Sequence, residues 1–398
     1  MHYVTSGYGD SMRPRDGLDR QRRRLVAGLR RAGVLADPHW LSAFRAIPRE
    51  PFVERFFLPH GWRWRAVDRT DPGWSDLVYA DRVLVTQLDD DPHAWERARR
   101  DGPIAGTPTC SSSMPTIMAI MLEELLASAG QNVLEVGTGT GYNAALLSHR
   151  LDESNVSTVD IDGSLVESAR AALAGIGLAP VCEVADGLRG FAARAPYDRV
   201  LCTCSVSAIP PEWLRQTRPG GLVVTTLNRP IGAGLVRVRS GGDGTGRGRV
   251  LPRDGRFMPL RAHRFGADDA VLARARAGGP RRRANLALRT VMDPASPFEF
   301  YAGLVLDGVL PHFPPDASGV TYLVHPDGSW VRHLLRDGSE FVEQGGPRQL
   351  WDAVERADGD WRALGRPLRD RFGITVTEEA QYLWLDAPDS PHRWPLGG

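Results

Sequence analysis

The chain has 398 residues, more than one average domain holds, so two or three domains are expected. Its formal net charge of +1 argues against the strongly basic field that would mark nucleic acid or a membrane surface as the main partner. All 49 cationic residues are arginines, which excludes a catalytic lysine. The four cysteines are too few and too scattered for a disulfide framework, and no apolar run resembles a membrane span or the core of a signal peptide. We therefore expect a cytoplasmic protein.

The first 130 residues predict mainly helices. Residues 1 to about 15 are polar and are expected to be frayed. Helical patterns follow in three places, at residues 17–35, 40–47 and 115–129. Between them, residues 82–86 predict a strand, and residues 89–106 form an acidic, polar stretch without clear periodicity. The hydroxyl groups of Ser111–Ser113 stand where they could cap the third helix.

The middle of the chain alternates short apolar runs with helical segments. Strands are predicted at residues 132–136, 156–161, 181–184, 199–202 and 222–226. Helices are predicted between them at residues 142–150, 164–178 and 211–216. This order is typical of the α/β class, and it predicts a parallel, doubly wound, Rossmann-like sheet.

The last third of the chain has a different pattern. Residues 234–251 predict a hairpin, and the Arg- and Gly-rich residues 261–284 suggest a linker or an exposed surface. Beyond them we expect a hairpin at residues 326–329, a helix at 349–364 and a strand at 381–385. The chain is therefore divided into an N-terminal helical, substrate-side segment (1–80), a Rossmann-like domain (81–254) and a smaller C-terminal α+β domain (255–398).

A glycine-rich turn, Gly137–Gly141, joins the first strand of the alternating region to the helix that follows. Glycines allow a tight turn and a close approach of the backbone to a cofactor, and the helix N-terminus offers free amides. Asp160 ends the next strand, at the spacing expected for a residue that binds a ribose hydroxyl. This pattern alone fits either a dinucleotide or a nucleoside sulfonium cofactor.

Three further features favour the sulfonium cofactor. Glu135 lies two residues before the first glycine, where methyltransferases place an acidic residue near the cofactor's amino group. Asp186 follows the third strand and could accept a hydrogen bond from the adenine amino group. Residues 218–221, Arg-Pro-Gly-Gly, are typical of the turn into the fifth strand. The alternative is that Glu135, Asp160 and Asp186 are ordinary solvated strand ends.

Motifs outside this turn resemble the protein-L-isoaspartate O-methyltransferase family. Residues 43–53 contain Ile-Pro-Arg-Glu-Pro-Phe-Val, which is similar to that family's N-terminal motif, and Tyr79-Ala-Asp81 matches its Tyr-x-Asp. Residues 196–200 and 209–214 match its fourth strand and the short helix after it. The resemblance covers roughly residues 40–230. It implies a class I methyltransferase fold that uses S-adenosylmethionine and releases S-adenosylhomocysteine.

The resemblance also implies the site residues. Those expected to bind the cofactor lie on the strand ends and the glycine turn: Glu135, Gly137, Thr138, Gly139, Gly141, Tyr142, Asn143, Asp160, Ile161, Asp186, Gly187 and Thr203. In the family, a hydroxyl residue before the helix that precedes the cofactor strand faces the acceptor, and Ser113, Ser111 and Ser112 occupy this place. Helix capping alone is the other explanation for these serines. No metal is expected, because Cys202 and Cys204 supply only two possible ligands.

The chain departs from the family's repair enzymes before the serines and after residue 255. A polar insertion reaches Gly106, and a further unit follows the methyltransferase region. This architecture resembles homologues that accompany ATP-grasp ligases in the maturation of ribosomal peptides (graspetides), and residues 373–388 are similar to the ends of such proteins. The resemblance implies a macrocyclised peptide partner, methylated on an aspartate that then closes to an aspartimide. Alternatives are general isoaspartyl repair, another small or peptidic acceptor, and a non-catalytic scaffold; neither a nucleic acid nor a membrane partner is expected.

Overall fold

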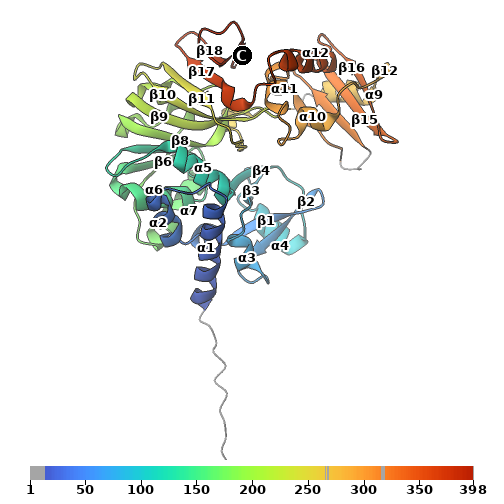
Figure 1. Ribbon diagram of the computed structural model, residues 1–398. Coiled ribbons are helices and arrows are strands. Elements are labelled where there is room, and N and C mark those ends of the chain that lie inside the picture. Colours follow the sequence, from blue (N-terminus) through green and yellow to red (C-terminus); the bar gives the residue numbers. More distant parts are fainter. Residues whose placement is uncertain (1–13, 265, 267–268, 315–318, 398) are drawn as a thin grey trace, which may run out of the picture. The chain divides into compact units, whose positions relative to one another are not determined.

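The computed structural model describes residues 14–264, 266, 269–314 and 319–397 (Figure 1). Most of the segment expected to be frayed lies outside these residues. The described chain divides into two compact units. Unit 1 contains the residues up to Ala129 together with Gly139–Ser154 and Ser164–Pro180. Unit 2 contains Gly130–Thr138, Asn155–Gly163 and the residues from Val181 onward.

Five parallel strands form one half of the main sheet of unit 2, in the spatial order β7-β6-β5-β8-β9. Their bounds are β5 (Val133–Val136), β6 (Val156–Asp160), β7 (Val181–Val184), β8 (Tyr197–Val206) and β9 (Thr217–Leu227). The strand order reverses between β5 and β8, and ligands of such sheets bind at this switch point, beyond the carboxyl ends of the strands. The doubly wound α/β class expected from the sequence is confirmed. The short helix α8 (Pro211–Arg215) lies between β8 and β9 in the chain.

Antiparallel strands extend this sheet to ten strands (Figure 1). They are β10 (Gly234–Ser240), β11 (Gly246–Val250), β17 (Phe372–Val376), β18 (Gln381–Leu385) and β19 (Arg393–Pro395). The predicted hairpin at residues 234–251 is confirmed as β10 and β11. Because β11 pairs with β17, strands from either side of residue 255 share one sheet. The division into three domains stays a prediction.

The rest of unit 2 contains a five-stranded antiparallel sheet and four helices. The strands are β12 (Arg281–Arg283), β13 (Leu310–His312), β14 (Val320–Val324), β15 (Trp330–Arg336) and β16 (Ser339–Gly345). The helices are α9 (Asp269–Ala277), α10 (Leu288–Met292), α11 (Glu299–Val305) and α12 (Leu350–Ala363). The expectation of a linker at residues 261–284 is wrong, because α9 buries Val271, Leu272 and Ala275 in an apolar cluster.

Unit 1 combines helices with a four-stranded antiparallel sheet of order β2-β1-β3-β4. Its strands are β1 (Arg55–His60), β2 (Arg63–Asp68), β3 (Leu84–Leu88) and β4 (Pro108–Ser112). Its helices are α1 (Pro14–Arg31), α2 (Pro38–Ala46), α3 (Trp74–Val78), α4 (Ala94–Asp101), α5 (Pro115–Leu125), α6 (Tyr142–Leu151) and α7 (Gly163–Gly175). The sequence did not predict the β1–β2 hairpin.

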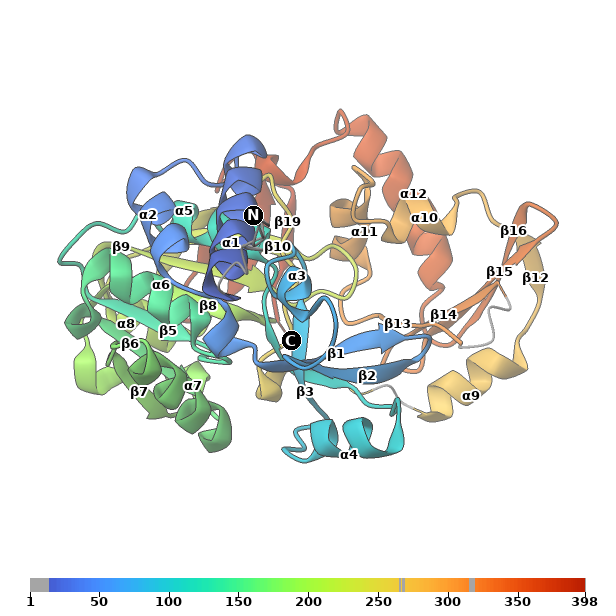
Figure 2. The ribbon, with the colours of Figure 1, turned by 90° about the horizontal axis from the view of Figure 1, so that it is seen from below.

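The polar stretch before the serines also differs from expectation, because it contains helix α4 (Figure 2). Ala94 and Ala98, one helical turn apart, pack on Phe57, Val85 and Leu88 of the sheet. Two alanines and the partly buried Trp95 make an apolar face too small to stand out from the surrounding charges. The helix therefore depends on the sheet that it covers, which the local sequence does not show.

Candidate functional site

The glycine turn starts in unit 2, at the carboxyl end of β5. Gly137 has φ +98°, a conformation that side chains rarely adopt, and its N–H donates to the carbonyl of Val159 (2.8 Å). A Cβ atom at this position would lie 2.8 Å from both Cys204 Sγ and Thr203 Oγ1. The Thr203 hydroxyl donates to the carbonyl of Gly137 (2.8 Å). Only glycine therefore fits the start of the turn, and Thr203 fixes the position of its backbone.

Glu135 is fully buried in β5. The hydroxyl of Thr158 donates to its Oε2 (2.7 Å), and the hydroxyls of Thr158 and Thr138 are 2.8 Å apart. A buried carboxylate requires hydrogen-bond donors, and Thr158 is one of them. The three side chains link β5 to β6 at the edge where the turn begins.

The other predicted cofactor residues of unit 2 follow the neighbouring strands β6 and β7. The side chain of Asp160 accepts from the N–H of Asp162 (3.1 Å), and Ile161 beside it is 49% exposed. The side chain of Asp186 accepts from the N–H of Leu188 (3.0 Å), and a Cβ atom at Gly187 would lie 2.6 Å from Val136 Cγ1. Parallel strands end at one edge of the sheet, so these residues share the edge with Glu135 and Gly137.

A segment that the sequence analysis missed runs along the same edge. Ser205 in β8 makes backbone hydrogen bonds with Met258 and Leu260, both 3.0 Å long. Arg261 forms an ion pair with Asp162 (2.7 Å), and the Leu260 side chain is the second neighbour of the Gly187 Cβ position, at 3.6 Å. Residues 257–263 therefore border the ends of β6, β7 and β8. The Arg- and Gly-rich composition that begins at Arg261 gave no local signal for this placement.

The glycine turn continues into unit 1. Gly141 has φ +86°, and a Cβ atom there would lie 3.0 Å from that of Ala169 in α7. Tyr142 and Asn143 begin α6 and are buried. The ring of Tyr142 packs against Phe52, with 5.7 Å between centroids, and burial raises its pKa to about 12. Tyr142 thus anchors the helix rather than presenting a titratable group.

The serines lie beside this part of the turn, within unit 1. A Cβ atom at Gly139 would be 3.7 Å from Cys110 Sγ and 3.9 Å from the carbonyl oxygen of Ser111. Ser111 and Ser112 belong to β4, the edge strand, and Ser113 follows it. Ser112 is buried, whereas Ser111 and Ser113 are half-buried. The structure therefore brings the predicted acceptor segment against the predicted donor turn.

The expectation that these serines cap the next helix is wrong. Helix α5 begins at Pro115 with Met114 at its N-cap position, where no side chain makes a capping hydrogen bond. Instead, Asp81 accepts from the N–H of Thr116 (2.8 Å) and from its hydroxyl (2.6 Å). The negative charge of this carboxylate also interacts favourably with the positive N-terminal end of the helix dipole. The serine hydroxyls are thus not used for this purpose.

Arg49 holds the serine segment in place, a role that the sequence analysis did not assign. It is fully buried, and its guanidinium donates to the carbonyl oxygens of Val78 (2.9 Å) and Ser113 (2.9 Å) and to the hydroxyl of Ser112 (3.1 Å). Burial lowers its pKa to about 10, against the attraction of Tyr142 and Asp81. An arginine inside the motif Pro-Arg-Glu-Pro was the signal available in the sequence.

Within the described ranges, no group of three histidine, cysteine or acidic side chains could hold a metal ion. None of the described helices combines the length and apolar character needed to cross a membrane.

A doubly wound sheet with a glycine turn at its switch point defines a Rossmann-like, cofactor-binding fold. Comparisons with known proteins narrow this fold to the methyltransferases. A solved structure titled protein-L-isoaspartate O-methyltransferase has a TM-score of 0.51 at 23% identity, covering 92% of this chain and 100% of that chain. The family model described as Protein-L-isoaspartate(D-aspartate) O-methyltransferase matches residues 93–262.

Two curated relatives carry the same name. The protein-L-isoaspartate O-methyltransferase of Xanthobacter autotrophicus is 34% identical over 62% of this chain and 94% of its own length. That of Azorhizobium caulinodans is 36% identical over 60% of this chain and 92% of its own. The chain belongs to the protein-L-isoaspartate O-methyltransferase family. The expected class of enzyme, a carboxyl methyltransferase, and the expected donor, S-adenosylmethionine, are confirmed by this membership. The individual site residues stay predictions.

Proposed function

We propose that the protein transfers a methyl group from S-adenosylmethionine to an isoaspartate-type side-chain carboxylate of a peptide or protein. The observation that supports this most directly is the proximity of Gly139, in the glycine turn, to the acceptor segment, since a Cβ atom at Gly139 would lie within 4 Å of Cys110 and Ser111. Methyl transfer needs the two reactants in line and almost in contact, so their binding segments must be adjacent.

The residues fit the donor because Gly137 opens a turn that a Cβ atom would block, and because the acidic side chains lie at or near the carboxyl ends of neighbouring strands. Glu135, Asp160 and Asp186 would hold its amino, ribose and adenine groups. When bound, S-adenosylmethionine supplies a methyl group activated by a sulfonium cation and leaves as S-adenosylhomocysteine.

The acceptor side requires orientation rather than a base. A carboxylate is already ionised at neutral pH, so no proton has to be removed. The half-buried hydroxyls of Ser111 and Ser113 could each donate to the acceptor carboxylate. Ser112 faces Arg49 instead, and we assign it a positioning role, since its hydroxyl accepts from the guanidinium. Arg49 thereby restricts the backbone on which the other two serines are held.

A narrower substrate is our second proposal: an aspartate of a macrocyclised ribosomal peptide, whose methyl ester then closes to an aspartimide. Its support is the altered acceptor side, where α4 and its apolar cluster precede β4. General isoaspartyl repair is the competing assignment. Chain length does not separate the two, because the solved protein-L-isoaspartate O-methyltransferase aligns with 92% of this chain.

The test uses labelled donor with three substrates: a linear isoaspartyl peptide, the same peptide with ordinary aspartate, and a side-chain-cyclised peptide containing aspartate. Turnover of the linear isoaspartyl peptide supports repair, and turnover of the cyclised peptide alone supports the dedicated role. An alkali-stable methyl group would contradict both and indicate transfer to nitrogen or an ether oxygen. Failure of calorimetry to detect donor binding would leave only a scaffold role.

A further inference from the structure

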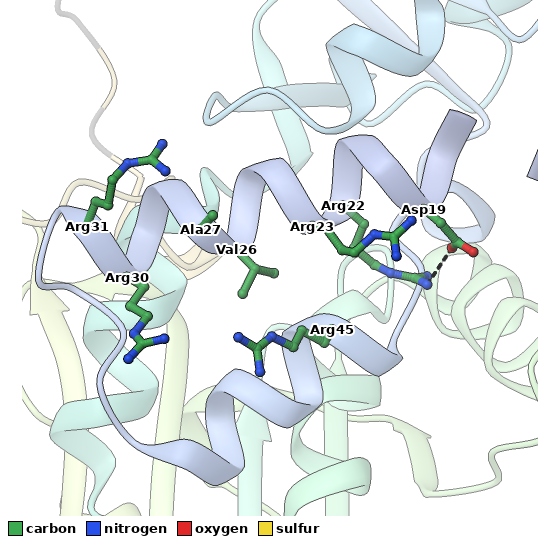
Figure 3. A pocket seen from close by; sticks show the side chains of 8 residues that line it. All are labelled: Asp19, Arg22, Arg23, Val26, Ala27, Arg30, Arg31 and Arg45. Carbon is green, nitrogen blue, oxygen red and sulfur yellow. Dashed lines mark hydrogen bonds and ion pairs between the residues drawn. The ribbon is translucent and has the colours of Figure 1, made fainter. Parts of the chain in front are cut away.

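A groove in unit 1 has no part in the site described above. It lies between α1 and α2 and has a volume of about 870 Å³ (Figure 3). Five of the eight residues that line it are arginines, and one is acidic: Asp19, Arg22, Arg23, Val26, Ala27, Arg30, Arg31 and Arg45. So many cations in one groove contrast with a whole-chain net charge of +1.

Most of these cations are not neutralised by the protein. Asp19 forms an ion pair with Arg22 (2.5 Å). Arg23, Arg30 and Arg45 are exposed, and the described residues include no acidic partner for any of them. Figure 3 shows Arg30 of α1 and Arg45 of α2 reaching into the same space from opposite helices. Like charges facing each other are unfavourable until an anion binds between them.

The dimensions of the groove suit an extended acidic peptide. Arg23 and Arg30 are seven residues apart on α1, which is two helical turns or about 10.5 Å. A peptide in the extended polyproline II conformation rises about 3.1 Å per residue with three residues per turn, so acidic side chains three residues apart share one face and lie about 9 Å apart. Ala27 lies between the two arginines, is exposed, and offers a small apolar surface to the intervening side chains. Arginine also binds carboxylates through two parallel hydrogen bonds.

A second cavity of unit 1 borders the acceptor segment. It has a volume of about 490 Å³, lies on another face of α1, and shares Arg31 with the groove. Its lining includes Asp81 and also Thr116. Thr116 lies at the start of α5, three residues after Ser113. A peptide could therefore follow α1 from the groove toward the serines without leaving unit 1.

We propose that the groove binds an acidic stretch of the peptide substrate, next to the residue that is methylated. This inference rests on the proposed function, since it names the kind of peptide that the acceptor site receives. The groove contributes affinity and selects acidic flanking sequences. It takes no part in the methyl transfer itself.

The first experiment measures binding without any methylation. A fluorescent peptide of twelve residues with a glutamate at every third position, free of aspartate and isoaspartate, is titrated with the full chain by fluorescence anisotropy at low salt. We expect the double variant R30E/R45E to bind about tenfold more weakly, which corresponds to a loss of roughly 1.4 kcal/mol of binding free energy. The matched control is R65E/R247E, which changes the net charge equally at two exposed arginines outside both cavities.

Several outcomes would overturn the proposal. One is equal binding by the two double variants, and another is equal binding of a peptide with glutamine in place of glutamate. A third is tighter binding of a single-stranded oligonucleotide of the same charge, lost in R30E/R45E, which would assign the groove to nucleic acid. Circular dichroism shows whether each variant is folded, and the single variants R30Q and R45Q serve if R30E/R45E is not.

Turnover then separates this inference from the proposed function. For an isoaspartyl peptide with acidic flanks, R30E/R45E should raise KM about tenfold with kcat unchanged, and a neutral-flanked peptide should be unaffected. If the wild-type protein methylates neither peptide, the proposed function fails, whatever the binding assay shows. If it methylates both with the same KM and the variant changes neither, only the groove proposal fails.

Discussion

The acceptor segment of unit 1 and the cofactor edge of unit 2 position their residues by different means. At the cofactor edge, the ends of parallel strands, close-packed glycines and buried hydroxyls each contribute. In the acceptor segment, one buried guanidinium joins the α3–β3 connection to the end of β4. A region supported by many small contacts tolerates the loss of one of them. A region whose main side-chain support is one cation is more sensitive to its loss, and substitutions can test this difference.

The largest effect is expected from Arg49→Met. The substitution leaves the carbonyls of Val78 and Ser113 and the hydroxyl of Ser112 without their charged donor. We expect a loss of about 3 kcal/mol in the free energy of unfolding and at least a hundredfold loss of kcat/KM. Denaturant unfolding measures the free energy of unfolding, and a methylation assay measures kcat/KM.

Arg49→Lys should recover part of the stability, because it keeps the charge but not the planar set of donors. Arg65→Met, at an exposed position of unit 1, is the matched control. If Arg49→Met is as stable and active as this control, the acceptor segment does not depend on Arg49 and the contrast between the regions disappears.

On the cofactor side, Gly137→Ala should act on donor binding. The new Cβ would meet Cys204 Sγ and Thr203 Oγ1 at 2.8 Å, in addition to the strain of φ +98°. We expect donor affinity to fall about thirtyfold by calorimetry, and stability to fall by about 1–3 kcal/mol. Gly130→Ala is the control, because φ is +78° there and nothing lies within 4 Å. Equal loss of affinity in both variants would show that strain, and not the close packing, is the cause.

A smaller effect is expected where a helix cap supports the acceptor segment. Asp81→Ala removes the acceptor for the N–H and hydroxyl of Thr116. The free energy of unfolding should fall by about 1 kcal/mol, measured by denaturant titration. The exposed Asp101→Ala should change it by less than about 0.5 kcal/mol. If Asp81→Ala costs no more than this control, the serines or water must satisfy the start of α5.

The smallest effect concerns pH and the segment along the cofactor edge. Burial lowers the pKa of His263, against the attraction of Asp186, and its Nδ1 accepts from the N–H of Ser207 (3.2 Å). The unfolded chain therefore takes up the proton first, so stability falls as the pH drops through 6.5 and levels off below the folded pKa.

Thermal unfolding at pH 5 and pH 7 measures this dependence. His263→Gln should reduce the difference in Tm between the two pH values by about 2 °C, whereas His60→Gln, at an exposed position, should leave that difference unchanged. A wild-type pH dependence that survives in His263→Gln would assign it to other groups.

The sequence determined the donor side of the protein to a large extent. Val133–Val136, the glycine turn and the next strands are short, contiguous patterns, and each was predicted within a few residues. Local patterns succeed there because a buried parallel strand is mostly apolar, and because a left-handed turn requires glycine. The motifs at residues 43–53 and 79–81 indicated the family because they too are short, contiguous patterns.

Only the tertiary structure decided how the acceptor side is held. The roles of Arg49 and Asp81, the helix α4 and the segment at residues 257–263 each depend on contacts between residues that are distant in the chain. The arginine groove depends on the placement of Arg45 in α2 beside the arginines of α1. An arginine looks the same in a sequence whether water or backbone carbonyl groups surround it. Its partners are chosen by the packing of β3, β4 and the helices, so its function follows from the fold and not from its neighbours in the chain.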